Sequence, residues 1–169
     1  EVPFRRPSEF ANDHAGTREV MAHAIGALGA ETEYEVTACV YPAAVLVTAE
    51  DYEKAFALLE DPAVNNVVPC TTFPYPVQRG FRMLPGGGIA MMYPEYALAR
   101  SQDLEPAYHD AGQFYLCHTR LWLGSDEMLG PAARMLLLPR YRIQDIDTEE
   151  DWIRAEQIFA LFRDPNAGN

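Results

Sequence analysis

The 169-residue chain is predicted to form a single α/β domain, spanning residues 1–169, with a mostly parallel sheet. Two observations predict this class. Segments with helical periodicity alternate with short apolar or β-branched runs, and those runs contain few polar residues, which is typical of strands covered on both faces. An apolar fraction of 49% is ordinary for a globular domain and is sufficient for a substantial core.

Three segments have apolar residues at the three- and four-residue spacing of a helix that packs one face on a sheet. Thr17 is placed as the N-cap of the first helix and Gly29 ends it, while Thr48 and Asp51 form a capping pair before the second. The six residues after Arg163 are expected to fray. The expected helices cover residues 17–28, 50–60 and 149–162.

Short apolar runs between and around these helices predict the strands. The stretch 73–108 is different, because it carries five of the 13 prolines and four of the 11 glycines. We interpret it as an excursion that leaves the sheet and returns to it. The expected strands cover residues 36–41, 64–70, 88–93, 113–117 and 135–138.

The charge pattern limits the function classes. Asp and Glu number 25 against 13 Lys and Arg, and the net charge of −12 argues against a nucleic-acid or anionic-membrane surface. The longest apolar stretch, 36–49, is broken by Pro42 and is shorter than the roughly 20 residues of a membrane span. Three cysteines without a Cys-x-x-Cys spacing, and an N-terminus without signal-peptide features, favour a cytoplasmic protein.

Asp145 and Asp147 lie between the arginine-rich segment 140–142 and the last expected helix. If this stretch is extended, both carboxylates project from the same side. Two such carboxylates suit a Mg²⁺ ion that also carries substrate phosphates. The alternative is a helix cap formed by Asp147 and Glu150, and both interpretations can hold because Asp145 is not needed for the cap.

A polar stretch leads into the fourth expected strand. Arg100, Gln102, Tyr108 and Tyr115 supply a guanidinium, an amide and two phenols, and Gly112 permits a close backbone approach. This mixture suits a polyhydroxylated acid such as a sugar acid. The alternative is a surface loop followed by an aromatic core strand.

Five segments, taken together and in order, resemble the cytidylyltransferases that activate nine-carbon sugar acids. The likeness covers nearly the whole chain, and His-Asp-Ala-Gly-Gln-Phe-Tyr at 109–115 makes it closest to the pseudaminic acid cytidylyltransferases. The segments are Val-Pro-Phe-Arg-Arg-Pro at 2–7, Asp-His-Ala-Gly-Thr at 13–17, Arg-Ser-Gln-Asp-Leu at 100–104, Tyr-His-Asp-Ala-Gly-Gln-Phe-Tyr at 108–115 and Gln-Asp-Ile-Asp-Thr-Glu-Glu-Asp-Trp at 144–152.

The resemblance implies a Rossmann-like nucleotide-diphospho-sugar transferase fold and a homodimer, with residues 73–108 as an inserted dimerisation or substrate-lid element. The implied reaction transfers CMP from CTP to pseudaminic acid and releases pyrophosphate. Asp145 and Asp147 would be the catalytic residues that hold Mg²⁺. Cytosine would contact Arg6, which by itself is typical of a charged loop, together with Ala15 and Thr17. The sugar acid would contact Arg100, Gln102, Tyr108, Tyr115 and Tyr41.

The chain departs from the family pattern in three places. Tyr41-Pro42 stands where sialic acid enzymes carry Gln-Pro, and Ala111-Gly112 stands where they carry Asn-Gly, so the expected substrate is not plain N-acetylneuraminic acid. The strand and Gly-Ser-Lys phosphate-binding loop that open the family are not in this sequence. We therefore expect the C-terminal portion of a cytidylyltransferase, which alone binds CTP poorly.

Two other functions stay open on the sequence. One is a non-catalytic sugar-acid-binding or dimerisation module without the triphosphate-binding loop. The other is a synthetase for a different nonulosonic acid, such as N-acetylneuraminic acid. A pocket that joined Asp145 and Asp147 to Arg100 and Tyr115 would favour catalysis, whereas carboxylates that only cap the last helix would favour the binding module.

Overall fold

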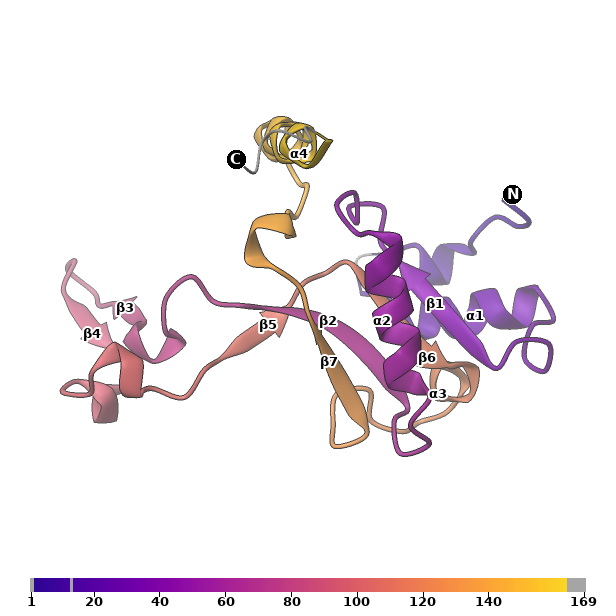
Figure 1. Cartoon of the computed structure of the whole chain (residues 1–169), viewed down its shortest axis with the longest axis horizontal. Helices are drawn as coiled ribbons and strands as arrows, with labels where there is room; N and C mark the ends of the chain where they lie inside the picture. The colour runs from indigo at the N-terminus through magenta and orange to yellow at the C-terminus, as the bar shows by residue number, and fades with distance from the viewer. Residues whose placement is uncertain (1, 13, 164–169) are drawn as a thin grey trace.

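The computed structural model describes residues 2–12 and 14–163. A sheet lies at the centre, a small two-stranded arm projects from it, and the last helix stands apart from the sheet (Figure 1). No helix among the described residues is long and apolar enough to cross a membrane. The expected frayed tail, 164–169, lies outside the described residues.

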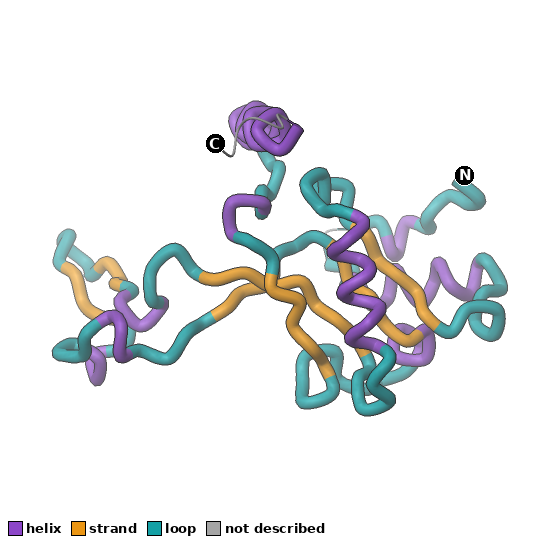
Figure 2. The backbone as a smooth tube through the Cα atoms, in the orientation of Figure 1, coloured by secondary structure: helices purple, strands orange, loops and turns teal. Residues whose placement is uncertain are grey.

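Five strands form the main sheet, in the order β1-β6-β2-β5, with β7 pairing on the other edge of β2 (Figure 2). The three expected helices are confirmed, and each of the five expected strands is confirmed with shifts of a few residues. Strands β3 (Phe81–Met83) and β5 (Tyr108–Asp110) and the short helix α3 (Thr119–Leu123) were not expected. The main-sheet strands are β1 (Val36–Val40), β2 (Asn66–Thr72), β5 (Tyr108–Asp110), β6 (Phe114–His118) and β7 (Ala133–Leu137).

The prediction of a mostly parallel sheet is wrong for the described residues. Only β2 and β7 pair in parallel, whereas β1 with β6, β2 with β6 and β2 with β5 are antiparallel. The apolar runs arise because both faces of the sheet are covered, and two-sided burial does not fix strand direction. The chain returns from the arm as β5 and β6, which both run antiparallel to β2, and β6 lies between β1 and β2.

Strands β5 and β6 lie along the same edge of β2, one after the other. Asp110 pairs with Cys70, and the Ala111 amide then donates to the Pro69 carbonyl at 2.9 Å. Gly112 follows with a φ of +61°, a conformation that favours glycine. The short irregular link turns the Asp110 side chain back toward β6.

Helix α2 (Ala49–Leu59) covers one face of the sheet. Ala55 and Leu59 are buried there against Val67, Phe114 and Leu136. The predicted cap is confirmed, because the Thr48 amide and hydroxyl both donate to the Asp51 carboxylate at 2.9 Å. This face is the larger apolar core.

Helices α1 (Thr17–Ala27) and α3 (Thr119–Leu123) cover the other face. A second core, which includes Ile25, Cys117 and Trp122, forms between them and the sheet. Gly16, and not Thr17, is the N-cap of α1, and its amide donates to the Glu19 carboxylate at 3.3 Å. Thr17 is thus the first helical residue, which leaves its hydroxyl available for another contact.

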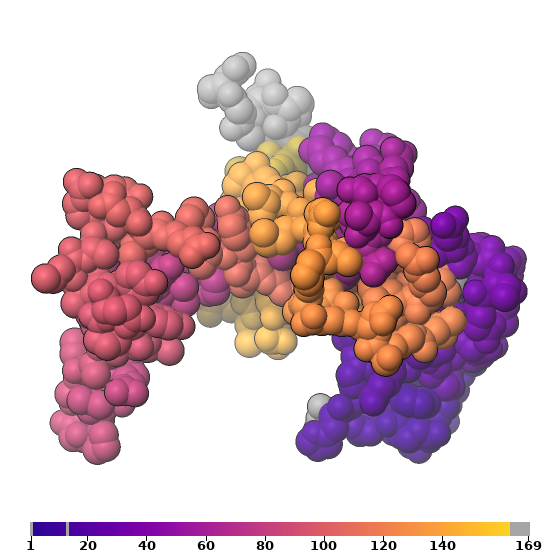
Figure 3. Space-filling model, turned by 90° about the horizontal axis from the view of Figure 1, so that it is seen from below, coloured from indigo at the N-terminus to yellow at the C-terminus, as the bar shows by residue number. Residues whose placement is uncertain are grey.

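Residues 73–107 leave the sheet after β2 and return at β5, and in Figure 3 this arm projects to one side of the body of the molecule. A hairpin of β3 (Phe81–Met83) and β4 (Ile89–Met91) forms its tip. Short 3₁₀ helices occur here and elsewhere in the described chain: η1 (Ser8–Phe10), η2 (Val77–Arg79), η3 (Pro94–Tyr96), η4 (Ser101–Asp103) and η5 (Arg140–Arg142).

The last helix, α4 (Glu149–Arg163), follows an irregular segment after β7 and η5. The expected Asp147–Glu150 cap is wrong. Thr148 takes this role: its amide and hydroxyl donate to the Asp151 carboxylate at 3.0 and 2.7 Å. The observed pair, Thr148 and Asp151, lies one residue further along the chain than Asp147 and Glu150. The Thr148 hydroxyl donates to the Asp151 carboxylate and accepts from the Asp151 amide, whereas an aspartate carboxylate can only accept.

Candidate functional site

A pocket of about 300 Å³ opens on the sheet face that carries α1, at the N-terminal end of this helix. The start of α1, strands β2 and β6, the end of β5 and the loop after α3 each contribute to it. Its wall is part apolar and part polar, which is typical of small-molecule sites. The lining residues are Gly16, Thr17, Arg18, Asn66, Val68, Asp110, Tyr115, Trp122, Met128 and Leu129.

Three phenol and hydroxyl groups and one carboxylate meet at this pocket. The Thr17 hydroxyl lies 2.9 Å from the Tyr41 phenol oxygen, and the Tyr41 and Tyr115 rings contact edge to face with centroids 5.7 Å apart. The Tyr115 hydroxyl donates to the Asp110 carboxylate, which also accepts the Gly112 amide at 2.8 Å. The structure therefore brings together three predicted site residues, Thr17, Tyr41 and Tyr115.

The Tyr115 phenol is held in its neutral form. Burial raises its pKa, and the neighbouring Asp110 carboxylate raises it further through its hydrogen bond and its charge. Tyr115 therefore keeps its proton across the physiological pH range. The group presents a fixed hydroxyl at the pocket, suited to binding a substrate hydroxyl and not to acting as a base.

A second pocket of about 370 Å³ lies beside the first and shares Val68, Asp110 and Leu129 with it. Tyr108, another predicted site residue, and Arg134 lie in its wall. Asp110 thus stands at the boundary between the two pockets. Together they form a continuous candidate binding surface on this face of the sheet.

The other residues predicted to bind the sugar acid lie on the arm. Gln102 lines a separate pocket of about 330 Å³ where the arm joins the body. Arg100 is exposed and forms an ion pair with Asp103 at 2.7 Å. The structure does not bring Arg100 or Gln102 to the pocket that contains Tyr115.

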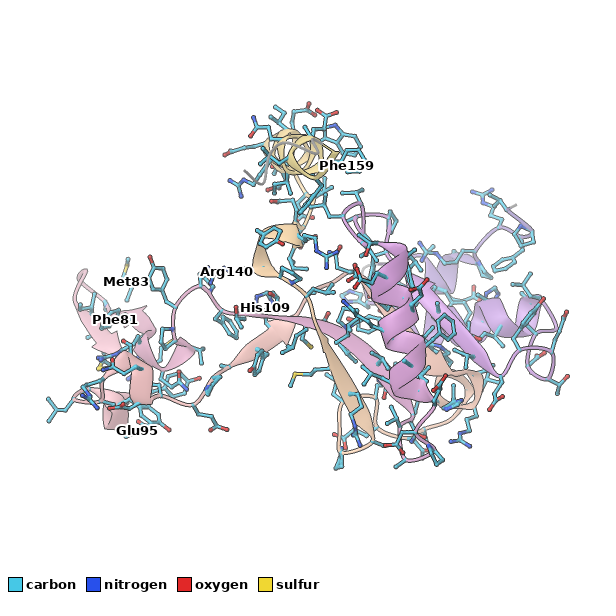
Figure 4. The ribbon with its side chains drawn as sticks, viewed as in Figure 1. Phe81, Met83, Glu95, His109, Arg140 and Phe159 are labelled. Carbon is cyan, nitrogen blue, oxygen red and sulfur yellow. The ribbon has the colours of Figure 1, made fainter. Side chains whose placement is uncertain are left out.

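The junction between arm and body is held by contacts around Phe73. Its ring lies 4.9 Å from that of His109, and its carbonyl accepts a hydrogen bond from Arg140 at 3.3 Å. Figure 4 shows His109 and Arg140 close to this junction, with Phe81 and Met83 out on the arm. The base of the arm is therefore fixed to both β5 and the segment after β7.

Two of the three predicted cytosine contacts, Ala15 and Thr17, lie at the start of α1. The Ala15 amide donates to the Asn12 side chain at 3.0 Å, one residue before the Gly16 cap. Arg6 is exposed in the segment that precedes η1 and forms no ion pair within the described part of the chain. Only Thr17 of this group lines the pocket.

Asp145 and Asp147 are exposed and lie in the irregular segment before α4, not in a strand. Neither carboxylate has a hydrogen bond or ion pair with another described residue, unlike that of Asp151. They are not in the wall of the pocket that contains Tyr115, and no group of three or more metal-binding side chains occurs in the described residues. Two uncommitted carboxylates fit Mg²⁺, which is usually held by one or two carboxylates, waters and substrate phosphates.

The sequence interpretation missed the polar residues inside the pocket. Asn66 interrupts the expected apolar strand 64–70, and this was the signal that a polar group faces a site. Arg18 lies within the expected first helix, where an arginine is ordinarily a surface charge. Asp110 belongs to the family-like segment 108–115, but the sequence interpretation gave it no role in the site.

No family model matches the chain. It is similar to the pseudaminic acid cytidylyltransferase of Campylobacter jejuni serotype O:2, with 32% identity over 162 residues that cover 95% of this chain and 70% of the relative. The protein of the same name from serotype O:23/36 is 31% identical over the same shares. A Helicobacter pylori protein named pseudaminic acid cytidylyltransferase and UDP-2,4-diacetamido-2,4,6-trideoxy-beta-L-altropyranose hydrolase is 30% identical over 83% of this chain and 27% of its own length.

Proposed function

The chain belongs to the pseudaminic acid cytidylyltransferase family, and from this premise we propose that it transfers CMP from CTP to pseudaminic acid and releases pyrophosphate. The observation that carries the proposal is the pocket at the start of α1, where Thr17 and Tyr115 come from two of the five family-like segments. The proposal includes a Rossmann-like fold of the nucleotide-diphospho-sugar transferases.

The pocket residues bind and orient the sugar acid in this proposal. The Tyr115 proton is donated to Asp110, so the Tyr115 oxygen and the Asp110 carboxylate can each accept a hydrogen bond from a hydroxyl group of the sugar, and the pair can hold neighbouring hydroxyl groups in a fixed position. Tyr41 supports the Tyr115 ring from the side. Because the chemistry has no covalent enzyme intermediate, positioning of the two substrates is the main contribution of the protein.

The nucleotide is proposed to lie near the start of α1, beside Thr17. The positive end of the helix dipole favours an anionic group there, and the exposed Arg6 is proposed to supply a positive charge. In the reaction the anomeric oxygen of the sugar acid bonds to the α-phosphorus of CTP. The bond from that phosphorus to the β-phosphate bridging oxygen breaks, and the hydroxyl proton passes to solvent.

Asp145 and Asp147 are proposed to hold Mg²⁺, because their carboxylates are exposed and uncommitted. The ion would neutralise phosphate charge and lower the pKa of the attacking hydroxyl. The protein contributes two hard oxygen ligands on a short segment before α4. Asp151 is excluded from this role because Thr148 occupies its carboxylate as the helix cap.

A homodimer and a cytoplasmic location complete the proposal. The arm exposes apolar side chains that a monomer would leave in water, among them Met83, which is 83% exposed, and Ile89, which is 70% exposed. Contiguous apolar surface of this kind favours pairing with a second copy.

The cytoplasmic location is supported by three free thiols, Cys39, Cys70 and Cys117.

The test is pyrophosphate release from CTP and Mg²⁺, with pseudaminic acid and N-acetylneuraminic acid compared as acceptors. CTP is used at a saturating concentration, in line with the poor CTP binding expected from the sequence. Slow release only with pseudaminic acid, accompanied by the CMP-sugar, is expected. Release with N-acetylneuraminic acid alone would favour the other synthetase. Sugar binding by calorimetry without any pyrophosphate release would favour the non-catalytic module.

A further inference from the structure

Two residues that line the pocket at the start of α1, Asn66 and Arg18, each have a buried polar atom without a hydrogen-bond partner, Asn66 Oδ1 and Arg18 Nε. Only one other such side-chain atom, on Gln78, occurs among the described residues. Asn66 is 1% exposed, so water outside the protein does not satisfy it. Buried polar groups in folded proteins are nearly always paired, which makes two in one pocket a sign of an absent ligand.

The orientation of both side chains is fixed by their other hydrogen bonds. The Asn66 amide nitrogen donates to the Met128 carbonyl at 2.8 Å, which leaves its oxygen as the atom without a partner. Arg18 Nη2 donates to the Asp126 carbonyl, and Arg18 forms no ion pair with a described residue. Both residues therefore bind the loop after α3 through one nitrogen, and each has one buried polar atom without a partner.

The two unpaired atoms are of opposite kind, an acceptor and a donor. A carboxylate would satisfy Arg18 but would be repelled by the Asn66 oxygen and by Asp110 in the same wall. A single water molecule would fill a small part of about 300 Å³, since its share of liquid volume is about 30 Å³. A secondary amide matches both atoms, because it carries one N–H and one carbonyl oxygen.

The apolar part of the wall suits the acyl end of such an amide. Val68, Trp122 and Met128 line the same pocket and offer a surface for a methyl group. We propose that Asn66 and Arg18 form the recognition site for an acetamido group of the sugar acid, with Asn66 Oδ1 accepting the amide N–H and Arg18 Nε donating to its carbonyl. This inference rests on the proposed function.

The experiment measures dissociation constants by calorimetry for pseudaminic acid, which has two acetamido groups, and for two analogues in which one or the other is an acetate ester. An ester keeps the carbonyl and the methyl but lacks the N–H. The wild-type protein is expected to bind one analogue about tenfold more weakly, as befits one lost hydrogen bond in a buried site.

Substitutions at Asn66 and Arg18 show which residue causes the difference in affinity between the amide and its ester analogues. Asn66→Leu should bring the amide and ester affinities within about twofold of each other, since the acceptor for the N–H is gone. Arg18→Lys keeps the charge but lacks Nε, and should weaken all three sugars by a similar factor while the amide preference stays. Asn65→Leu is the matched control, because this neighbouring asparagine is outside the pocket and should behave as wild type.

Equal affinities for the amide and both esters in the wild type would overturn the inference, as would an unchanged preference in folded Asn66→Leu. Unchanged affinity in Arg18→Lys would overturn the role given to its Nε. Should Asn66→Leu fail to fold, the wild-type ligand comparison and Arg18→Lys decide between these outcomes. Failure of the wild type to bind any of the three sugars would contradict the proposed function itself.

Discussion

Arg142 and Asp51 form a two-point ion pair that ties helix α2 to the segment before α4. Arg142 Nη1 lies 2.6 Å from Asp51 Oδ2, and Nη2 lies 2.9 Å from Oδ1. Asp51 is 2% exposed, and it also accepts from Thr48 at the helix cap. Because Asp145 and Asp147 follow Arg142 by only a few residues, this pair anchors the carboxylates proposed to hold Mg²⁺.

Removal of one partner should destabilise the protein strongly. Arg142→Met leaves the buried Asp51 carboxylate without its counter-ion, at an expected cost of about 3–5 kcal/mol in the free energy of unfolding. Urea denaturation measures this loss. Lys54→Met is the control, because the Lys54–Glu50 pair is exposed and should contribute less than about 1 kcal/mol. Equal effects of the two substitutions would contradict the anchoring role.

The same pair predicts a pH dependence of stability. Burial opposes ionisation of Asp51, but hydrogen bonds from Arg142 and Thr48 outweigh it and lower the pKa of the carboxyl below its ordinary 3.8. A lowered pKa in the folded state means that the stabilisation is present above pH about 4 and is lost as pH falls through the folded-state value. Between pH 6 and pH 2, the free energy of unfolding should fall less in Asp51→Asn than in the wild type.

Substitution of the proposed metal ligands should abolish activity without unfolding the protein. Asp145→Asn and Asp147→Asn are each expected to reduce kcat about 100-fold or more. The loss is expected to exceed that seen when a residue that only orients a metal ligand is removed, because these carboxylates would bind the ion directly. Both residues are exposed, so the thermal midpoint should stay near that of the wild type. Pyrophosphate release at several Mg²⁺ concentrations measures the effect.

Asp151→Asn is the matched control for these variants. Its carboxylate is occupied by Thr148, and that hydrogen bond is the main reason that its pKa is lowered. The substitution should loosen the start of α4 but leave the Mg²⁺ dependence of the rate unchanged. Full activity in both Asp145→Asn and Asp147→Asn would remove the basis for a metal site in this segment.

The sequence predicted the helices and most strands because periodicity and caps are local properties. The direction of β6 was not predictable in the same way, since it depends on how residues 73–107 return to the sheet and not on the residues of β6. The pocket shows the same limit. Asn66 contacts the carbonyl of Met128, 62 residues further along the chain, and no local pattern links the two.

Tyr115 is expected to contribute to sugar binding more than to stability. Tyr115→Phe keeps the ring beside Tyr41 but removes the hydroxyl that donates to Asp110. Affinity for pseudaminic acid should fall about tenfold, while the free energy of unfolding changes by no more than about 1.5 kcal/mol. Calorimetry and denaturation measure the two effects. Tyr141→Phe is the control. The Tyr141 ring contacts Phe162 and does not line the pocket, so this variant should bind the sugar as the wild type does.

The arm should control self-association. Met83 is exposed on β3, and a glutamate there would place a charge in the proposed interface between two copies. We expect the wild type to sediment as a dimer at micromolar concentration and Met83→Glu to sediment as a monomer with unchanged far-ultraviolet circular dichroism. Leu28→Glu, at an exposed apolar position at the end of α1, is the control and should remain dimeric. A monomeric wild type, or dissociation by Leu28→Glu in place of Met83→Glu, would show that the arm is not the dimer interface, and its apolar residues would then need another explanation.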